Sequence, residues 1–270
     1  MSASDLVTER APRKYQAIQV ERRGTSAVLT LDNPARKNAI GPVMANELLY
    51  ALEDASFDPE VRTIILTGAG DAFCSGGDFA QMLGGGAEEA LPHKGDYADL
   101  LLVMTNYTKP IIARVNGVAM GGGLGLVAAS HFAVAIDTAK LGTPEVNVGL
   151  FPMMIMAVLA RLVPKRRLLQ MMLFGEKFGA DVAKELNLVG SVVKAGELDA
   201  AVDAIAAEIA SKSPITLGYG LEAYAKQCEM DLADALPYLR GRLGACLATD
   251  DAREGLSAFM ERRKPNFTGK

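Results

Sequence analysis

The sequence has few of the residues that build metal sites, histidine triads and disulfide frameworks. It contains two histidines, His93 and His131, and three cysteines, Cys74, Cys228 and Cys246, without CxxC spacing. Two histidines argue against a multi-histidine metal site or a catalytic histidine triad. An odd number of scattered cysteines predicts reduced thiols rather than disulfides. We therefore expect no metal, and we expect a protein of the cytoplasm.

The sequence also lacks long apolar runs and long basic runs. A membrane span needs about 18 apolar residues, whereas "GLFPMMIMAVLARLV" contains Pro152 and stops at Arg161. The chain has 28 basic and 32 acidic residues and a net charge of −4, with no basic block longer than "ERRKP". The first residues, "MSASDLVTERAPRKYQ", have no apolar stretch typical of a signal peptide. We expect no membrane and no nucleic-acid partner.

Several common catalytic motifs are absent. The GxGxxG pattern fails because Leu126 stands where the third glycine would be, and GxSxG fails around Ser75 because Phe73 takes the first glycine position. Neither GxxxxGK[ST] nor HExxH occurs. These absences argue against a Rossmann nucleotide site, a P-loop, a zinc protease and an α/β-hydrolase.

The first two thirds of the chain alternate β-type runs with turns and helical stretches. The β-type runs include "SAVLTLDNP", "VRTIILTGAG", "KPIIARVNG" and "HFAVAID", and "GPVMANELLYALEDASFD" has helical spacing of its apolar residues. This alternation predicts a layered α/β fold with crossover connections. Residues 83–97, "LGGGAEEALPHKGDY", are rich in glycine and charge and are predicted to form a mobile loop.

From Pro164 onward the pattern turns helical, and Ser213-Pro214 marks the start of the last helical group. We place a soft boundary near residue 200. The predicted organisation is a flexible lead at 1–14, a sheet-bearing core at 15–200 and a helical region at 201–270. The apolar faces of that last region must pack on the core or on another subunit.

After these motifs are excluded, two glycine-rich turns and one carboxylate are the remaining candidates for a catalytic site. "AFCSGGDF" follows one β-type run and "AMGGGLG" follows another, and both can open a helix whose N–H groups point at an anion. Two such turns could form an oxyanion hole, although glycine spacing by itself is more typical of tight turns and close packing. Glu145 lies in "LGTPEVNVGLFP" beside apolar residues, where burial would raise its pKa and suit it as a base. A carboxylate near a helix start is the alternative.

Taken in order, six segments of this chain resemble the crotonase superfamily, the enoyl-CoA hydratase and isomerase family. They are "LDNPARKNAI", "IILTGAGDAFCSGGD", "KPIIARVNGVAMGGGLGLVAASHFAVAID", "LGTPEVNVGLFP", "LFGEKFGADVAKELNLVGSVV" and "EGLSAFMERRKPNF". The resemblance implies a spiral of repeated ββα units with a helical carboxy-terminal region used in trimerisation, as a homotrimer or a dimer of trimers. It implies an acyl-CoA thioester as substrate and no separate cofactor.

The resemblance also implies roles for particular residues. Glu145 would be the catalytic base, and the N–H groups of Ser75 and Gly122 would hold the thioester oxygen. The substrate path would be lined by Ala35, Arg36, Lys37, Ala39, Ser75, Gly76, Gly77, Asp78, Gly121 and Gly125. Phe259 and Lys264 would reach the nucleotide of a neighbouring subunit.

One departure from the family pattern bears on the reaction. Hydratases of this family carry a second glutamate two residues after the triple glycine, where this chain has Gly125. The second acid of dienoyl-CoA isomerases is replaced by Met153. A single base is sufficient for an isomerase that moves a proton along a 3-enoyl thioester, so we expect Δ3-Δ2-enoyl-CoA isomerisation. The alternatives are a 2-enoyl-CoA hydratase that works without the carboxylate at 125, and a non-catalytic acyl-CoA-binding protein.

Overall fold

The computed structural model describes residues 13–82, 84 and 91–270. Of the predicted flexible lead at 1–14 the structure describes residues 13 and 14, and of the predicted mobile loop at 83–97 it describes residues 84 and 91–97. The strands are β1 (Ile18–Arg23), β2 (Ser26–Leu31), β3 (Thr63–Gly68), β4 (Ala72–Cys74), β5 (Ile111–Val115), β6 (Val118–Met120), β7 (Phe132–Ile136), β8 (Lys140–Gly142), β9 (Lys177–Gly179) and β10 (Ser191–Val193). The helices are α1 (Pro42–Phe57), α2 (Phe79–Met82), α3 (Tyr97–Thr105), α4 (Gly122–Ala129), α5 (Met153–Leu159), α6 (Lys165–Phe174), α7 (Ala180–Glu185), α8 (Leu198–Ala210), α9 (Pro214–Gln227), α10 (Leu232–Leu247) and α11 (Asp250–Glu261).

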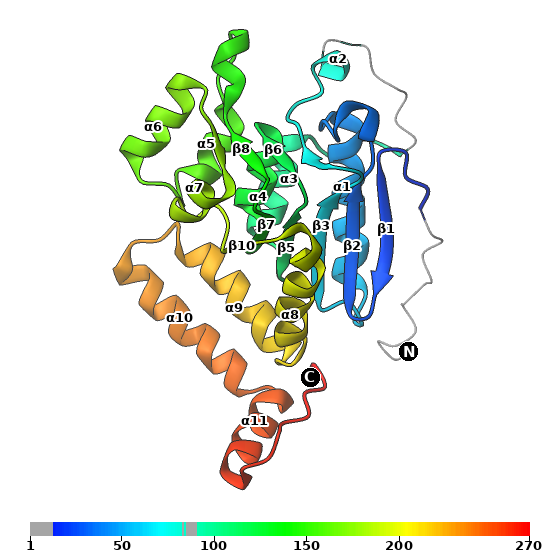
Figure 1. Ribbon diagram of the computed structural model, residues 1–270. Helices are drawn as coiled ribbons and strands as arrows, with labels where there is room; N and C mark the ends of the chain where they lie inside the picture. The colour runs from blue at the N-terminus through cyan, green and yellow to red at the C-terminus, as the bar shows by residue number, and fades with distance from the viewer. Residues whose placement is uncertain (1–12, 83, 85–90) are drawn as a thin grey trace.

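The larger sheet has the order β1-β2-β3-β5-β7-β10 and is parallel except for the β1/β2 hairpin. Its central strands are rich in apolar residues: β3 reads TIILTG and is buried throughout, and β5 reads IIARV and is buried except at Arg114. Strands in which successive residues are buried are typical of parallel sheets covered on both faces. Helix α1 contacts β1 and β2, and α8 contacts β3, β5 and β7 (Figure 1).

The smaller sheet has the order β4-β6-β8-β9, with β4, β6 and β8 parallel. Each of its parallel strands follows a strand of the larger sheet after a short corner, in the pairs β3/β4, β5/β6 and β7/β8. The chain therefore repeats one unit in which the first strand joins one sheet and the second joins the other. Helix α4 fills the space between them and contacts β4, β5 and β6. The predicted α/β class with a spiral of ββα units is confirmed.

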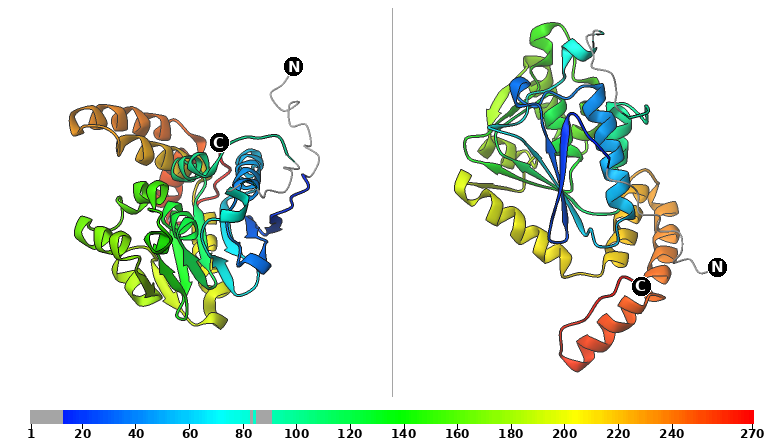
Figure 2. Two further views of the ribbon diagram at one scale, coloured as in Figure 1. Left: turned by 90° about the horizontal axis from the view of Figure 1, so that it is seen from above. Right: turned by 90° about the vertical axis from the view of Figure 1, so that its right-hand side faces the viewer.

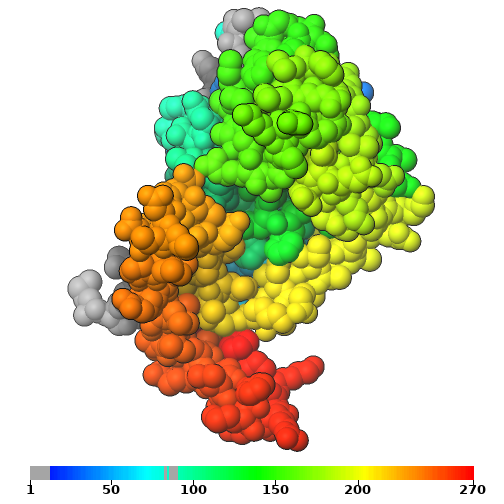
Figure 3. All heavy atoms as spheres, turned by 90° about the vertical axis from the view of Figure 1, so that its left-hand side faces the viewer, coloured from blue at the N-terminus to red at the C-terminus, as the bar shows by residue number. Residues whose placement is uncertain are grey.

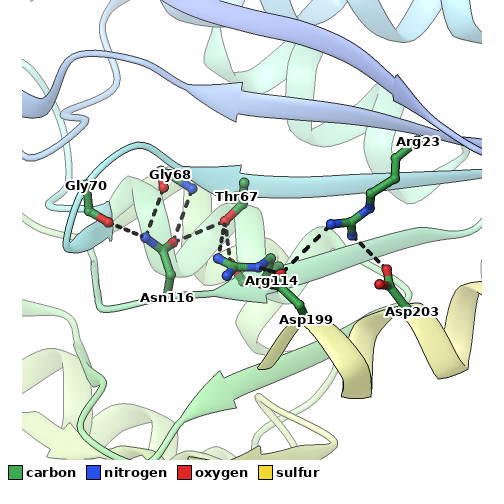
Figure 4. A network of polar contacts seen from close by, with 8 residues as sticks. All are labelled: Arg23, Thr67, Gly68, Gly70, Arg114, Asn116, Asp199 and Asp203. Atoms are coloured by element: carbon green, nitrogen blue, oxygen red, sulfur yellow. Dashed lines mark hydrogen bonds and ion pairs between the residues drawn. The ribbon is translucent and has the colours of Figure 1, made fainter. Parts of the chain in front are cut away.

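The corner between β5 and β6 is fixed to the corner between β3 and β4 by one side chain. The Asn116 amide group donates to the carbonyl oxygens of Gly68 at 2.9 Å and Gly70 at 3.0 Å, and its oxygen accepts from the Gly68 N–H at 3.2 Å. Figure 4 shows these bonds continuing through Thr67 and Arg114 to Asp199 on α8. These bonds fix the two corners, and with them the starts of β4 and β6, to one another.

The carboxy-terminal helices lie outside the two sheets. The right-hand view in Figure 2 places α10 and α11 at one end of the molecule, and in Figure 3 they form an arm beside the rest of the chain. Helix α9 begins at Pro214 with Ser213 as its N-cap, as predicted; the Ser213 side chain accepts from the Thr216 N–H. Within the described ranges, no helix is long and apolar enough to cross a membrane.

Some expectations differ from the structure in detail. The chain after Pro164 was expected to be helical, yet it contains β9 and β10, and β10 pairs with β7 in the larger sheet. Three-residue strands are too short to produce a period-2 pattern. The boundary predicted near residue 200 falls inside α8, whose Val202 and Ala206 are buried in the core. The division into domains at that residue stays a prediction.

Candidate active site

The candidate site lies where three neighbouring strands of the smaller sheet end. Strands β4, β6 and β8 are parallel and adjacent, so their carboxyl ends meet at one edge. The turn Ser75–Asp78 follows β4, Gly121 and Gly122 follow β6, and Glu145 follows β8. The structure therefore brings together three features that are far apart in the sequence.

Gly121 is the point of contact between these segments. Its φ of +48° lies in the left-handed region that favours glycine. A Cβ atom at this position would lie 2.8 Å from Glu145 Oε1 and 3.7 Å from the Cα atom of Gly76. Any side chain here would displace the carboxylate, so Gly121 is required for the approach of Glu145 to the two turns.

Glu145 is a partly buried carboxylate in the 3₁₀ turn Pro144–Val148. Its Oε2 atom is buried and has no hydrogen-bond partner within the described residues. Burial raises the pKa of the carboxyl, and a bond from its own backbone N–H lowers it by a smaller amount. A carboxylate that lacks partners and resists ionisation is suited to accept a proton from a bound molecule.

The Gly122 N–H is the first N–H of α4 and has no acceptor within that helix. No other described residue accepts from it, whereas the preceding Gly121 N–H donates to the Gly142 carbonyl at 2.9 Å. The Gly122 N–H, beside Glu145, is thus available to an external oxygen.

Ser75 requires a correction as the second backbone donor. Its N–H donates to the Lys37 carbonyl at 2.9 Å, and its Oγ donates to the Arg36 carbonyl at 3.0 Å. The Ser75 N–H is therefore already used. The motif "CSGGD" alone does not show which N–H group is left without an acceptor. The sequence therefore could not distinguish Ser75 from its neighbours.

The N–H of Gly77, two residues later, is available in this turn. The residues on either side of it bond to Ile40, since the Ile40 N–H donates to the Gly76 carbonyl and the Asp78 N–H donates to the Ile40 carbonyl, both at 2.8 Å. In an extended chain consecutive peptide groups point in opposite directions, so the Gly77 N–H points away from Ile40. No described residue accepts a hydrogen bond from it.

Some of the residues predicted to line the substrate path are connected to one another by an ion pair. The exposed Arg36 guanidinium donates to the buried Asp78 carboxylate at 2.6 Å, which joins residues 35–39 to the turn after β4. Ala35 and Lys37 are exposed, whereas Ala39 is buried. Asp78, 3% exposed, also accepts from Gln81. Its carboxylate holds the turn together internally.

Phe259 and Lys264 are not brought near this group in the single chain. Phe259 is 83% exposed on α11, and Lys264 is exposed in the segment after it. Figure 1 places α11 at the end of the molecule away from α2, which follows the turn after β4. Their role toward a neighbouring subunit stays a prediction.

The position expected to distinguish the possible reactions, Gly125, is enclosed by two side chains. A Cβ atom at Gly125 would lie 2.3 Å from Tyr97 Oη and 2.4 Å from Ile155 Cγ2. The Tyr97 hydroxyl donates to the Gly122 carbonyl at 2.6 Å. Sequence reasoning missed Tyr97 because residues 83–97 were interpreted as a loop. The signal present was "DYADLLLVM", an N-cap residue before an apolar helix.

The comparisons agree with this geometry. A family model described as enoyl-CoA hydratase/isomerase matches residues 21–270. A protein of Bacillus subtilis named "Probable enoyl-CoA hydratase" is 36% identical over 248 residues, covering 90% of this chain and 95% of that protein. The crotonyl-CoA hydratase of Syntrophomonas wolfei is 34% identical over 258 residues, covering 95% and 99%. The solved structure titled enoyl-CoA hydratase subunit I from Geobacillus kaustophilus superposes with a TM-score of 0.87 at 31% identity, covering 96% and 100%.

The paired sheets, with glycine turns and a carboxylate at their common edge, define an enzyme of the crotonase fold. The chain belongs to the enoyl-CoA hydratase/isomerase family of the crotonase superfamily.

Proposed function

We propose that this chain is a Δ3-Δ2-enoyl-CoA isomerase that acts through a thioester enolate with Glu145 as its base. The observation that carries the proposal is the pairing of one raised-pKa carboxylate with a neighbouring position that holds no acid. Glu145 has a buried oxygen without a partner, and the space at Gly125 is taken by Tyr97 and Ile155. One group that takes and returns a proton meets the needs of isomerisation.

In the proposed reaction, Glu145 removes a proton from C2 of a 3-enoyl thioester. The electron pair moves into a dienolate, with negative charge on the thioester oxygen. The same carboxyl group then returns the proton to C4, which leaves a 2-enoyl thioester. No water is consumed, and coenzyme A is part of the substrate, so no separate cofactor is required.

The oxyanion would be held by two backbone donors, the N–H groups of Gly77 and Gly122. Both lack an acceptor among the described residues, and both lie in the adjoining turns after β4 and β6. Fixed N–H dipoles stabilise the enolate more than the neutral carbonyl, which lowers the barrier. Ser75, proposed first for this role, would instead fix the turn through its bonds to Arg36 and Lys37.

The substrate path would run along residues 35–39 and the turn after β4, with Arg36 at the surface for the charged part of coenzyme A. We extend the proposal to the assembly: a homotrimer, or a dimer of trimers, in which Phe259 and Lys264 reach a neighbouring subunit. Their exposure on and after α11 supports this role.

Hydration of 2-enoyl thioesters is the second candidate. The names of the relatives favour it, since the similar proteins from Bacillus subtilis and Syntrophomonas wolfei are both named as hydratases. Addition of water requires one group to activate the water and another to orient or deliver the proton. A hydratase of this sequence would need water or another side chain in place of the missing acid.

Product analysis with matched 3-enoyl and 2-enoyl thioesters tests the proposal. We expect conversion of the 3-enoyl to the 2-enoyl thioester, with slower formation of the 3-hydroxyacyl thioester. E145Q is expected to lower kcat for isomerisation about a thousandfold, because it removes the base. The control is E185Q, a change at an exposed glutamate of α7. Full isomerase activity in E145Q would overturn the role of Glu145. Binding of acyl-CoA without turnover would favour a non-catalytic protein.

A further inference from the structure

Tyr97 contacts Gly122, the residue whose N–H is the proposed oxyanion donor. It is the first residue of α3, and its hydroxyl donates to the Gly122 carbonyl at 2.6 Å. The ring lies over the same glycine, since a Cβ atom on Gly122 would be 3.6 Å from Tyr97 Cζ. Tyr97 thus bonds to the residue whose N–H faces the bound oxygen.

The segment before Tyr97 is held in place by hydrogen bonds to α1. Asn46 of α1 is 1% exposed; its amide nitrogen donates to the Pro92 carbonyl at 3.1 Å, and its oxygen accepts from the Lys94 N–H at 2.7 Å. Gly95 follows, where a Cβ atom would lie 2.9 Å from Leu49 Cδ1. A buried asparagine is therefore used to hold the backbone that leads into Tyr97.

The helix itself fixes the other side. Asp96 accepts from the N–H groups of Ala98 and Asp99, and the Asp99 side chain accepts from the Asp96 N–H at 2.9 Å. This capping box defines the first turn of α3 and the direction in which its first side chain leaves. Of the predicted mobile loop at 83–97, the described residues from Pro92 onward are anchored.

The Tyr97 hydroxyl occupies the space that a side chain at position 125 would fill. Tyr97 Oη is 2.3 Å from the point where a Cβ atom of Gly125 would stand, with Ile155 Cγ2 closing the other side at 2.4 Å. Gly125, Gly122 and Gly121 belong to one turn of chain, and Gly121 contacts the Glu145 carboxylate. The phenol and Glu145 therefore flank the same turn.

The hydroxyl is protonated at physiological pH and cannot act as a base. Burial raises the pKa of Tyr97 well above its ordinary value, and the Cys74 thiol and the Glu145 carboxylate raise it further. Its single proton is directed at the Gly122 carbonyl. A phenol that has used its proton in this way can accept a hydrogen bond but has no proton to deliver to a substrate carbon.

We propose that Tyr97 is a positioning residue that selects isomerisation over hydration: its hydroxyl holds Gly122 in place through the carbonyl group of that residue and closes the space beside Gly125 to a reacting water. The inference rests on the proposed function. Hydration forms a bond from water oxygen to C3 and a bond from a proton to C2, so it needs room for the water. Isomerisation breaks the C2–H bond and forms a C4–H bond through Glu145, so it needs no such room.

The test is the ratio of 3-hydroxyacyl to isomerised product, measured for wild type and for Y97F and Y97A. Y97F keeps the ring and removes the bond to Gly122, so kcat is expected to fall about tenfold with KM unchanged while the product ratio stays low. Y97A opens the space, so the ratio is expected to rise about tenfold or more toward hydration, which corresponds to about 1.4 kcal/mol between the two barriers.

Tyr107, just beyond the other end of α3, supplies the matched control. It is also a buried tyrosine whose hydroxyl donates to a backbone carbonyl, that of Leu52 at 2.5 Å, but it packs against α1. Y107F and Y107A are expected to lower thermal stability and to leave both the product ratio and kcat of the folded fraction unchanged. A purely structural role for Tyr97 would make the two pairs of variants behave alike.

The outcomes separate the two proposals. Wild-type isomerisation with an unchanged ratio in Y97A and unchanged kcat in Y97F overturns the role of Tyr97 alone. If Y97A does not fold, the fall in kcat of Y97F against Y107F still decides it. A wild-type chain that mainly hydrates 2-enoyl thioesters overturns both, since water then reacts with Tyr97 in place. G125E adds a check: it is expected to destabilise the chain, and Y97A is expected to relieve only the part of that loss that comes from Tyr97 Oη, because Ile155 stays against the same position.

Discussion

The edge of the smaller sheet and the carboxy-terminal helices differ in how much of their surface is packed within the single chain. At the sheet edge, the turns after β4, β6 and β8 lie so close together that a Cβ atom on Gly121 would be 2.8 Å from Glu145 Oε1 and 3.7 Å from the Cα atom of Gly76. On α10, four leucines remain more than half exposed: Leu232, Leu236, Leu243 and Leu247. Their spacing of four, seven and four residues puts them on one face of the helix.

The difference indicates which part of the molecule is complete within one chain. At the sheet edge, the N–H groups of Gly77 and Gly122 and one oxygen of the Glu145 carboxylate have no partner within the described residues, so a substrate could bind there. The exposed leucine stripe is apolar surface that water solvates poorly. We therefore expect the two regions to respond differently to substitution: changes in the first should affect catalysis or folding, and changes in the second should affect assembly.

Charged residues in place of the exposed leucines of α10 should have the largest effect, which is on assembly. In the double variant L236E/L243E, two carboxylates would have to be buried in the proposed subunit interface, so we expect the assembly to dissociate to monomers at micromolar concentration. Sedimentation velocity measures the change. The control V20E adds a charge to the exposed edge strand β1, where Val20 is 45% exposed, and should leave the assembly intact. A wild-type chain that is already monomeric would contradict the expectation.

His131 should make the stability of the sheet region depend on pH. Its Nδ1 accepts from the Ile111 N–H at 3.0 Å, and burial lowers its pKa from 6.5 to about 4. Between these values the unfolded chain binds a proton that the folded chain does not. Stability should therefore be constant above about pH 6.5 and fall by about 3 kcal/mol as pH drops to 4.

Urea unfolding of wild type and H131Q at pH 7, 5 and 4 measures this contribution. The glutamine can accept a hydrogen bond but does not titrate, so H131Q should lose less stability than wild type between pH 7 and 4. Equal losses in the two proteins would assign the acid sensitivity to other groups.

Substitutions in the network of Figure 4 should have the smallest effects, which are on the free energy of unfolding. One exposed ion pair of the same network serves as the control. N116A removes the bonds to Gly68 and Gly70 and leaves buried backbone groups unpaired, which should cost about 2 kcal/mol of the free energy of unfolding. D203N removes an ion pair with Arg23 in which both side chains are about half exposed, and should cost less than about 1 kcal/mol. Equal losses in denaturant titrations would contradict this distinction between the corner and the surface.

The sequence predicted those parts of the site that follow from local patterns. An apolar run followed by glycines located the turns after β4 and β6, and Glu145 stood out as an acid among apolar residues. It could not predict which N–H in "CSGGD" is available, because this depends on the bonds of Ser75 to Lys37 and of Gly76 to Ile40. Such pairings are set by the packing of distant segments.

Tyr97 illustrates the same limit. Its contact with Gly122 joins residues 25 positions apart, and its placement depends on Asn46 of a third segment. A glycine-rich stretch before it obscured the start of α3. The fold was easier to predict, because the apolar residues that cluster in β3 and β5 are a local pattern typical of strands covered on both faces.

The transfer of a labelled hydrogen tests the central claim, catalysis by one carboxylate, most directly. Wild type is mixed in a single turnover with a 3-enoyl thioester that carries deuterium at C2, and the products are analysed by mass spectrometry and NMR. The account predicts a 2-enoyl product with deuterium at C4, because Glu145 returns the hydrogen that it removed. A 3-hydroxyacyl product, or an isomerised product with no deuterium at C4, would contradict it.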